Sequence, residues 1–223
     1  MKIKTISTGS SGNAYILTTS DGKHLLLDAG LPIQEIKIGL NFDLGNLEGC
    51  VISHRHNDHV KSASKLENMG IRVFRPYNIE QDILKTQIGS FAITSFPVPH
   101  NGTPNRAFII KADGETVLYL SDAEFCEYKL KSENITAMLV ECNYQEDMLS
   151  ENSHISHTVL GHLELSTCRD FVAQNATDAL KTVLLIHASE SGCLNKGNAV
   201  KVVQEGVPKA RVFMATKGLA VEL

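Results

Sequence analysis

Short apolar runs separated by polar turns divide the chain into many predicted strands and a few helices. Alternation of apolar and polar residues predicts strands at 2–7 and 91–99, and apolar-rich runs beside turn signals predict strands at 14–19, 107–111 and 116–120. Asp21-Gly22 and Asp113-Gly114 are hairpin signals between such runs. Continuous apolar runs predict buried strands at 25–27, 49–53, 71–74, 137–142 and 182–186.

Helical spacing of the apolar residues predicts helices between these strands. The expected helices span 32–40, 60–69, 79–85, 163–176 and 198–206, with one or two helical turns at 145–150. Residues 211–214 and 219–221 are expected to form a closing hairpin. Antiparallel hairpins combined with strand–helix units favour an α/β fold of two stacked sheets with helices outside.

The composition is that of an ordinary globular protein. The chain has 223 residues, 43% hydrophobic and 21% charged, and no linker is visible, so we expect a single domain over 1–223. No apolar run reaches the roughly 18 residues of a membrane span, and the alternating N-terminus does not resemble a signal peptide. We therefore expect a cytoplasmic protein, in which the five scattered cysteines are buried thiols.

The charge balance bears on the partner. A net charge of −4 argues against a broad basic surface for long duplex nucleic acid. It does not exclude a small anionic substrate, because bound metal cations would supply positive charge locally. The acidic balance leans towards short or single-stranded substrates.

One stretch concentrates candidate chemistry. Four side chains that bind metals, His54, His56, Asp58 and His59, fall within six residues. A predicted buried strand precedes them and a predicted helix follows, so the cluster lies on a turn at the carboxyl end of a strand, where ligands gather in layered α/β folds. This density predicts a metal site.

Three more candidate ligands each follow a predicted strand. They are His100, Asp122 and His187. Residues at matching strand ends converge when the strands share a sheet or face one another. Imidazole and carboxylate suit divalent Zn or Mn, and seven ligands suffice for two divalent metal ions.

The motif resembles the signature of the metallo-β-lactamase superfamily. That signature, His-x-His-x-Asp-His, stands here as His54 to His59, and the family's later His, Asp and His match His100, Asp122 and His187. The resemblance implies a four-layer αββα sandwich of two mixed β-sheets flanked by helices. It also implies one ion on His54, His56 and His100 and another on Asp58, His59 and His187, with Asp122 bridging.

A narrower resemblance is to the YycJ/WalJ-like exonuclease branch, whose members are described as DNA exonucleases. It is carried by residues 8–13 (TGSSGN), 27–30 (LDAG), 141–143 (ECN), 161–163 (GHL) and 186–189 (IHAS).

Two metals about 3.5–4 Å apart can share a bridging hydroxide that is nucleophilic near neutral pH. This chemistry serves phosphodiesters and carbonyl compounds alike. A phosphodiester needs a general acid for its basic leaving group, and His162 lies in the interval where nuclease branches of the superfamily carry a histidine. The alternative is a purely structural role, in which His162 only caps the following helix. His154 and His157 are rivals for the same role.

We therefore expect a metal-dependent phosphodiesterase acting on nucleic acid, such as single-stranded or short DNA, or on small or cyclic nucleotides. Asp58 and His162 are its candidate catalytic residues. The alternatives are a carbonyl hydrolase of thioesterase, lactonase or lactamase type and a non-catalytic binding module. The sequence also allows a homodimer.

Other residues are candidates for supporting roles. Substrate contacts are expected from Ser10, Ser11, Asn13 and Asn143. Asp28, Glu124 and Glu141 are candidates for orienting the ligands. The positive charges expected nearest the site are those of Arg55, Lys61 and Arg106.

Overall fold

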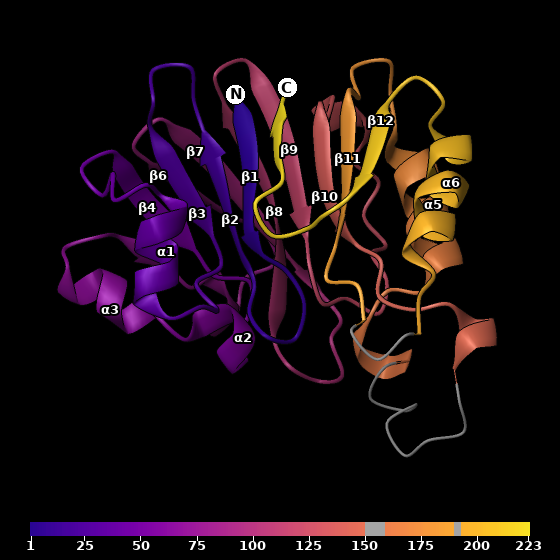
Figure 1. Cartoon of the computed structure of the whole chain (residues 1–223), viewed down its shortest axis with the longest axis horizontal. Helices are drawn as coiled ribbons and strands as arrows, with labels where there is room; N and C mark the ends of the chain where they lie inside the picture. Colours follow the sequence, from indigo (N-terminus) through magenta and orange to yellow (C-terminus); the bar gives the residue numbers. More distant parts are fainter. Residues whose placement is uncertain (150–158, 190–192) are drawn as a thin grey trace.

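The computed structural model describes residues 1–149, 159–189 and 193–223. Two mixed β-sheets pack face to face, with α1 to α3 on one outer side and α5 and α6 on the other (Figure 1). This confirms the four-layer αββα sandwich. No helix in the described ranges is long and apolar enough to cross a membrane.

The first sheet has six strands in the order β13-β1-β2-β3-β4-β5. Pairing is antiparallel from β13 to β3 and parallel from β3 to β5. The strands are β1 (Lys2–Ser7), β2 (Ala14–Thr18), β3 (His24–Leu27), β4 (Leu47–Val51), β5 (Val73–Phe74) and β13 (Ala220–Glu222). Its outer face carries α1 (Ile33–Gly39), α2 (Asn57–Val60) and α3 (Ala63–Asn68).

The second sheet has seven strands in the order β12-β11-β10-β9-β8-β7-β6. Strands β9 to β12 are parallel, and β6 to β9 are antiparallel. They are β6 (Leu84–Ile88), β7 (Phe91–Val98), β8 (Asn105–Ala112), β9 (Glu115–Leu120), β10 (Ala137–Glu141), β11 (Thr182–Ile186) and β12 (Arg211–Met214). Helices α5 (Leu165–Asn175) and α6 (Lys196–Gly206) cover its outer face. Short 3-10 turns occupy Pro76–Asn78, Lys131–Glu133 and Glu146–Met148.

Three apolar layers hold these elements together. Alternate residues such as Leu25, Leu27 and Tyr119 face between the sheets, whereas their neighbours Leu26 and Leu118 pack under the outer helices. Central strands are therefore buried on both faces, which explains their continuous apolar sequences.

Most predicted elements are confirmed, including both hairpins and the helices that became α1, α5 and α6. Three predictions were wrong in detail. The helix expected at 79–85 is absent. Residues 79–83 form an irregular loop, and β6 begins at Leu84, where partly buried residues alternate as an edge strand against β7. The helix expected at 60–69 is divided into α2 and α3.

The closing hairpin was the third error. Strand β12 pairs with β11 in the second sheet, whereas β13 pairs with β1 in the first. Residues 215–219 therefore cross from one sheet to the other instead of making a tight turn.

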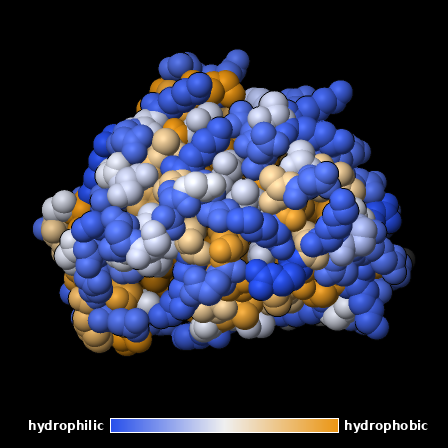
Figure 2. All heavy atoms as spheres, turned by 90° about the horizontal axis from the view of Figure 1, so that it is seen from above, coloured by the Kyte–Doolittle hydropathy of each residue, from blue (hydrophilic) through white to orange (hydrophobic). Residues whose placement is uncertain are grey.

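The carboxyl ends of β3, β4, β7, β9, β10 and β11 meet at one end of the sandwich, near α2 (Figure 1). The chain termini lie at the opposite end, whose surface is mostly hydrophilic with small apolar patches (Figure 2).

Candidate metal centre

Several site residues are placed by unusual backbone conformations. Asp28, Asp122 and His187 directly follow β3, β9 and β11, or lie one residue beyond them, and have φ angles of 57°, 51° and 51°. Residues other than glycine rarely adopt this left-handed region, and such strain clusters at functional sites. It lets each strand end turn sharply so that its polar side chain reaches the shared edge.

One histidine cluster joins the turn before α2 to the end of β7. His54 Nε2 lies 2.9 Å from His56 Nδ1, and His100 Nε2 lies 3.2 Å from the same atom. Burial is the main cause that lowers the pKa of all three histidines, and neighbouring histidines lower it further for His54 and His56. The imidazoles are therefore held neutral, as ligation requires.

A second cluster lies beside the first. His59 Nε2 is 3.4 Å from Asp58 Oδ2 and 3.4 Å from Asp122 Oδ2, and His187 Nε2 is 3.7 Å from Asp58 Oδ2. Burial would lower the pKa of His59, but Asp122 and Asp28 raise it well above its usual value. Burial would raise the pKa of Asp58, but the neighbouring imidazoles of His187 and His59 lower it.

These distances test whether the residues fit metal ions. Nitrogen ligands about 2.0–2.1 Å from a tetrahedral Zn²⁺ lie roughly 3.3–3.4 Å from one another. The separations of 2.9 to 3.7 Å within the two clusters bracket that value. In addition, His187 Nε2 is a buried nitrogen with no hydrogen-bond partner among the described residues. The donor set therefore fits two divalent cations.

Asp122 lies between the clusters. Its Oδ2 is 3.7 Å from His54 Nε2 in the first and 3.4 Å from His59 Nε2 in the second. The main chain of this residue is held by Asn105, whose amide donates to the Ser121 and Asp122 carbonyls. All seven predicted ligands thus converge, in the two groups that the family resemblance implied.

Asp28 orients the second cluster from behind. Its fully buried carboxylate accepts hydrogen bonds from Ser53 N–H, Ser53 Oγ, His59 Nδ1 and Tyr119 OH, at 2.5 to 2.9 Å. The bond to Nδ1 places the proton on that nitrogen and leaves His59 Nε2 free to ligate. His100 is oriented in the same way by the Gly161 carbonyl, 2.6 Å from its Nδ1.

Glu141, at the end of β10, joins His187 to His162. Its Oε1 lies 2.9 Å from His187 Nδ1 and 2.7 Å from His162 Nδ1. The His162 ring stacks on His187 with centroids 5.2 Å apart, and it also lies 5.6 Å from His100. Burial would lower the pKa of His162, but Glu141 outweighs it and raises the pKa.

The predicted substrate contacts lie around this centre at different depths. Ser10 and Ser11 are exposed in the loop between β1 and β2. Asn13 is fully buried, bonded to both Gly9 backbone groups and 3.1 Å from His59 Nε2. Asn143 donates to the His187 carbonyl at 2.7 Å. Both amides thus contact ligand residues, and a substrate role for the four residues stays a prediction.

Other residues named from the sequence lie further from the ligand clusters or bond to groups outside them. Arg106 is buried and its guanidinium donates to the carbonyls of Ile79, Gln81 and Asp82, so it anchors that loop and is not a solvated charge. Glu124 accepts from the Asn101 N–H, beside His100. His154 and His157 lie outside the described residues.

The sequence reasoning missed four supporting residues. They are Thr8, whose hydroxyl accepts from His187 N–H, and Ser53, Asn105 and Tyr119. Ser53 directly precedes the motif and was the one visible from its position. Thr8 lies in the loop after β1, within the TGSSGN stretch, whereas Asn105 and Tyr119 come from the distant strands β8 and β9 and carry no local signal.

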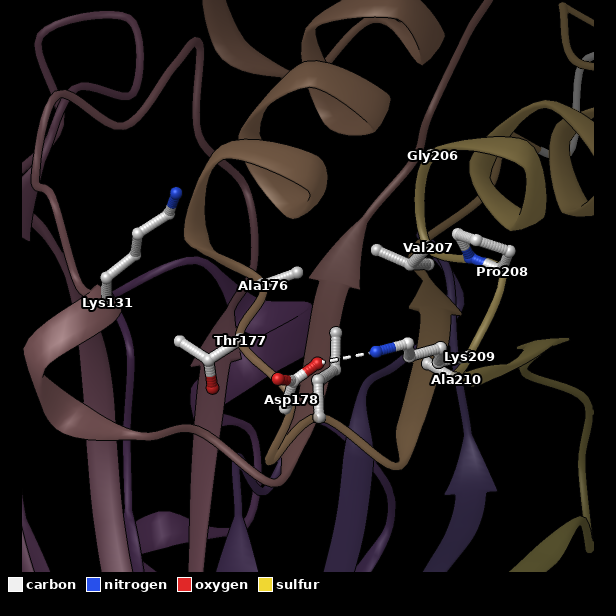
Figure 3. A pocket seen from close by; sticks show the side chains of 10 residues that line it. Lys131, Ala176, Thr177, Asp178, Gly206, Val207, Pro208, Lys209 and Ala210 are labelled. Carbon is white, nitrogen blue, oxygen red and sulfur yellow. Dashed lines mark hydrogen bonds and ion pairs between the residues drawn. The ribbon is translucent and has the colours of Figure 1, made fainter.

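A pocket of about 530 Å³ lies elsewhere, at the amino ends of β11 and β12 (Figure 3). Its Asp178 and Lys209 pair with each other at 2.8 Å, and none of the seven converging ligands lines it. The chemistry therefore lies at the opposite ends of these strands.

The chain is similar to known proteins over its whole length. A family model described as the metallo-beta-lactamase superfamily matches residues 7–69. Exodeoxyribonuclease WalJ of Streptococcus pneumoniae is 23% identical over 254 residues, which cover 99% of this chain and 91% of WalJ.

Two solved structures share the fold. The metallo-beta-lactamase fold protein YhfI from Bacillus subtilis has a TM-score of 0.76 at 18% identity, covering 99% of this chain and 98% of its own. Zn²⁺-bound PqqB from Methylobacterium extorquens has a TM-score of 0.69 at 13% identity, covering both chains fully. The matched motif region, the relative that is similar over its full length and the two-sheet fold all agree with the resemblance to the metallo-β-lactamase superfamily.

Proposed function

We propose that this superfamily hydrolase is a phosphodiesterase dependent on two divalent metal ions. One observation carries the proposal: His162 stands beside the second ligand cluster, stacked on His187 and hydrogen-bonded through Nδ1 to the buried Glu141. A histidine so placed serves cleavage that expels a basic alkoxide, whereas a thioesterase, whose thiolate leaves without protonation, gains little from it. The similarity to an exodeoxyribonuclease agrees with this reading.

The residues have distinct roles in this proposal. His54, His56 and His100 would hold one ion, Asp58, His59 and His187 the other, and Asp122 would contact both. When bound, the ions activate the nucleophile and neutralise charge on the phosphoryl oxygens. The carboxylate of Asp58 would be one of the ligands of the second ion.

His162 would donate a proton from Nε2 to the leaving oxygen. Glu141 accepts at Nδ1 and so holds the ring with Nε2 directed away from the carboxylate. The negative charge of the Glu141 carboxylate would compensate the positive charge of a protonated His162. Exposed Ser10 and Ser11, with Asn13 and Asn143, would contact the substrate or support the groups that do.

Two substrates with different leaving groups test this role. In His162→Ala, turnover of a dinucleotide, which expels an alkoxide, should fall by about 10²–10⁴. Turnover of bis-p-nitrophenyl phosphate should change little, because p-nitrophenolate leaves without protonation. Metal content should remain that of the wild type, and His24→Ala, at the amino end of β3, is the matched control.

An equal loss on both substrates would contradict the general-acid role. Activity on a thioester or lactone alone would replace the proposal by the carbonyl hydrolase, and absence of bound transition metal would favour a binding module. The choice between zinc and manganese, cyclic nucleotides as substrates, a single domain over 1–223, a cytoplasmic location and a homodimer stay predictions from the sequence.

A further inference from the structure

Exposed apolar side chains gather at the end of the sandwich that carries the ligands. The relevant surface, here called the rim, consists of residues 52–62, 75–83, 121–127, 142–149 and 159–164, which follow the carboxyl ends of strands or lead into α5. Six large hydrophobic side chains of the rim are 40–49% exposed: Ile79, Ile83, Phe125, Met148, Val159 and Leu160.

Two of these residues lie in segments that are hydrogen-bonded to the His100 loop: Leu160 through its own carbonyl and Phe125 through its neighbour Glu124. Glu124, next to Phe125, donates its N–H to the Pro99 carbonyl and accepts from the Asn101 N–H. The same Asn101 N–H lies 2.9 Å from the Leu160 carbonyl. The segments that carry Phe125 and Leu160 therefore adjoin the loop of the first-cluster histidine, and the two residues are 47% and 49% exposed.

The rim is poor in positive charge. Its basic residues are Arg55, Lys61 and Arg75, and Arg75 is paired with Glu67. One further lysine, Lys196, lies just outside the rim at the start of α6, next to Asn195, which bonds to Gln145. Apart from the candidate ligands Asp58 and Asp122, its acidic residues are Glu80, Asp82, Glu124, Glu127, Glu146, Asp147 and Glu164. The sequences at 150–158 and 190–192 contain no lysine or arginine.

This combination disfavours a long polynucleotide. Binding along a strand draws its affinity from lysine and arginine at successive phosphates, and acidic side chains there repel the backbone. A short ester presents one phosphate to the two cations, and its base finds an aromatic and an aliphatic side chain beside the site.

We propose that the site takes short phosphodiesters, mononucleotide esters or dinucleotides, whose base packs against Phe125 and Leu160. The inference rests on the proposed phosphodiesterase function and narrows its substrate.

Chain length and salt test the substrate class. The metal-loaded protein is assayed on thymidine 5′-(p-nitrophenyl phosphate), a thymidine dinucleotide and a 20-nucleotide thymidine strand, at 50 and 200 mM salt. One phosphate contact on a single strand predicts about a threefold loss of kcat/KM over this range, and six contacts predict roughly 300-fold. We expect at most about threefold, with no gain in kcat/KM from dinucleotide to 20-mer.

A binding measurement supplies a readout independent of turnover. Fluorescence anisotropy of a labelled 20-mer should give a Kd weaker than about 10⁻⁴ M, the upper end of non-specific binding. A micromolar Kd that weakens steeply with salt, together with a preference for the 20-mer, would overturn the inference and leave the phosphodiesterase proposal standing. Failure to cleave any of the phosphodiesters would instead overturn the proposed function.

Phe125→Ala tests the base contact. Its KM for thymidine 5′-(p-nitrophenyl phosphate) should rise at least fivefold, while KM for methyl p-nitrophenyl phosphate, which has the same leaving group but no base, stays unchanged. Phe42→Ala is the matched control, since Phe42 is 65% exposed beside α1 and outside the rim. An equal rise for both esters, or none for either, would show that the base does not pack against Phe125.

Discussion

Asp28→Asn should weaken metal binding although Asp28 is not among the seven predicted ligands. The substitution preserves the size of the side chain, and asparagine tolerates the φ of 57° as aspartate does. It replaces an oxygen that accepts from Ser53 Oγ, His59 Nδ1 and Tyr119 OH by an amide that donates. The two hydroxyls can rotate to accept, but His59 can accept only by moving its proton to Nε2.

That proton would occupy the nitrogen that faces Asp58 and Asp122. A metal ion can then bind without His59 as a ligand, or the proton must move back from Nε2 to Nδ1. In the second case Nδ1–H faces the amide N–H of the introduced asparagine, and a buried donor has no acceptor. We expect metal affinity to fall about 10–100-fold, the range seen when such supporting partners are removed. The unpaired donor should lower the free energy of unfolding by about 1–3 kcal/mol, or Tm by roughly 2–12 °C.

Calorimetric titration of the metal-free protein with Zn²⁺, combined with thermal unfolding, measures both effects. Asp113→Asn is the matched control, because Asp113 has a φ of 55°, lies in the exposed β8–β9 turn and bonds to Ser20. Two equivalents of zinc bound to Asp28→Asn with wild-type affinity would refute the account of the His59 tautomer.

Three further predictions concern metal binding, the backbone beside the metal ligands and the acidity of the Cys126 thiol. Adding metal at about 1,000 times its Kd should stabilise the folded state by about 4 kcal/mol and raise Tm by roughly 8–16 °C, reversed by chelator; an unchanged Tm would argue against metal binding. Gly30→Ala should abolish tight metal binding, because a Cβ there would clash with the Asp58 carbonyl, whereas Gly45→Ala, with open space, should bind normally; calorimetry compares them. Burial raises the pKa of Cys126 to about 11, so in Cys193→Ser its reaction with iodoacetamide should be slow at pH 8 and accelerate about tenfold per pH unit up to pH 10; a rate independent of pH would contradict this assignment.

The candidate ligands were recognisable from the sequence for a local reason. Each strand end, each hairpin turn and the dense His54–His59 motif depends on residues that are close together in the sequence, so hydrophobic period and residue spacing reveal them. Once each ligand is placed at a strand end, the fold has few ways to separate them. The seven residues therefore converge as expected.

Tertiary structure decided what the local pattern leaves open. Residues 84–88 form a strand because they can pair with the edge of β7. Residues 211–214 and 220–222 do not pair with each other, because each pairs with a strand of a different sheet. The contacts of Asp28 with Tyr119 and of Glu141 with His187 join residues 91 and 46 positions apart. Such contacts depend on how two sheets pack, which a pattern of neighbouring residues does not encode. The short motif therefore specifies where metal can bind, whereas the packing of distant strands determines which nitrogen of each histidine faces it.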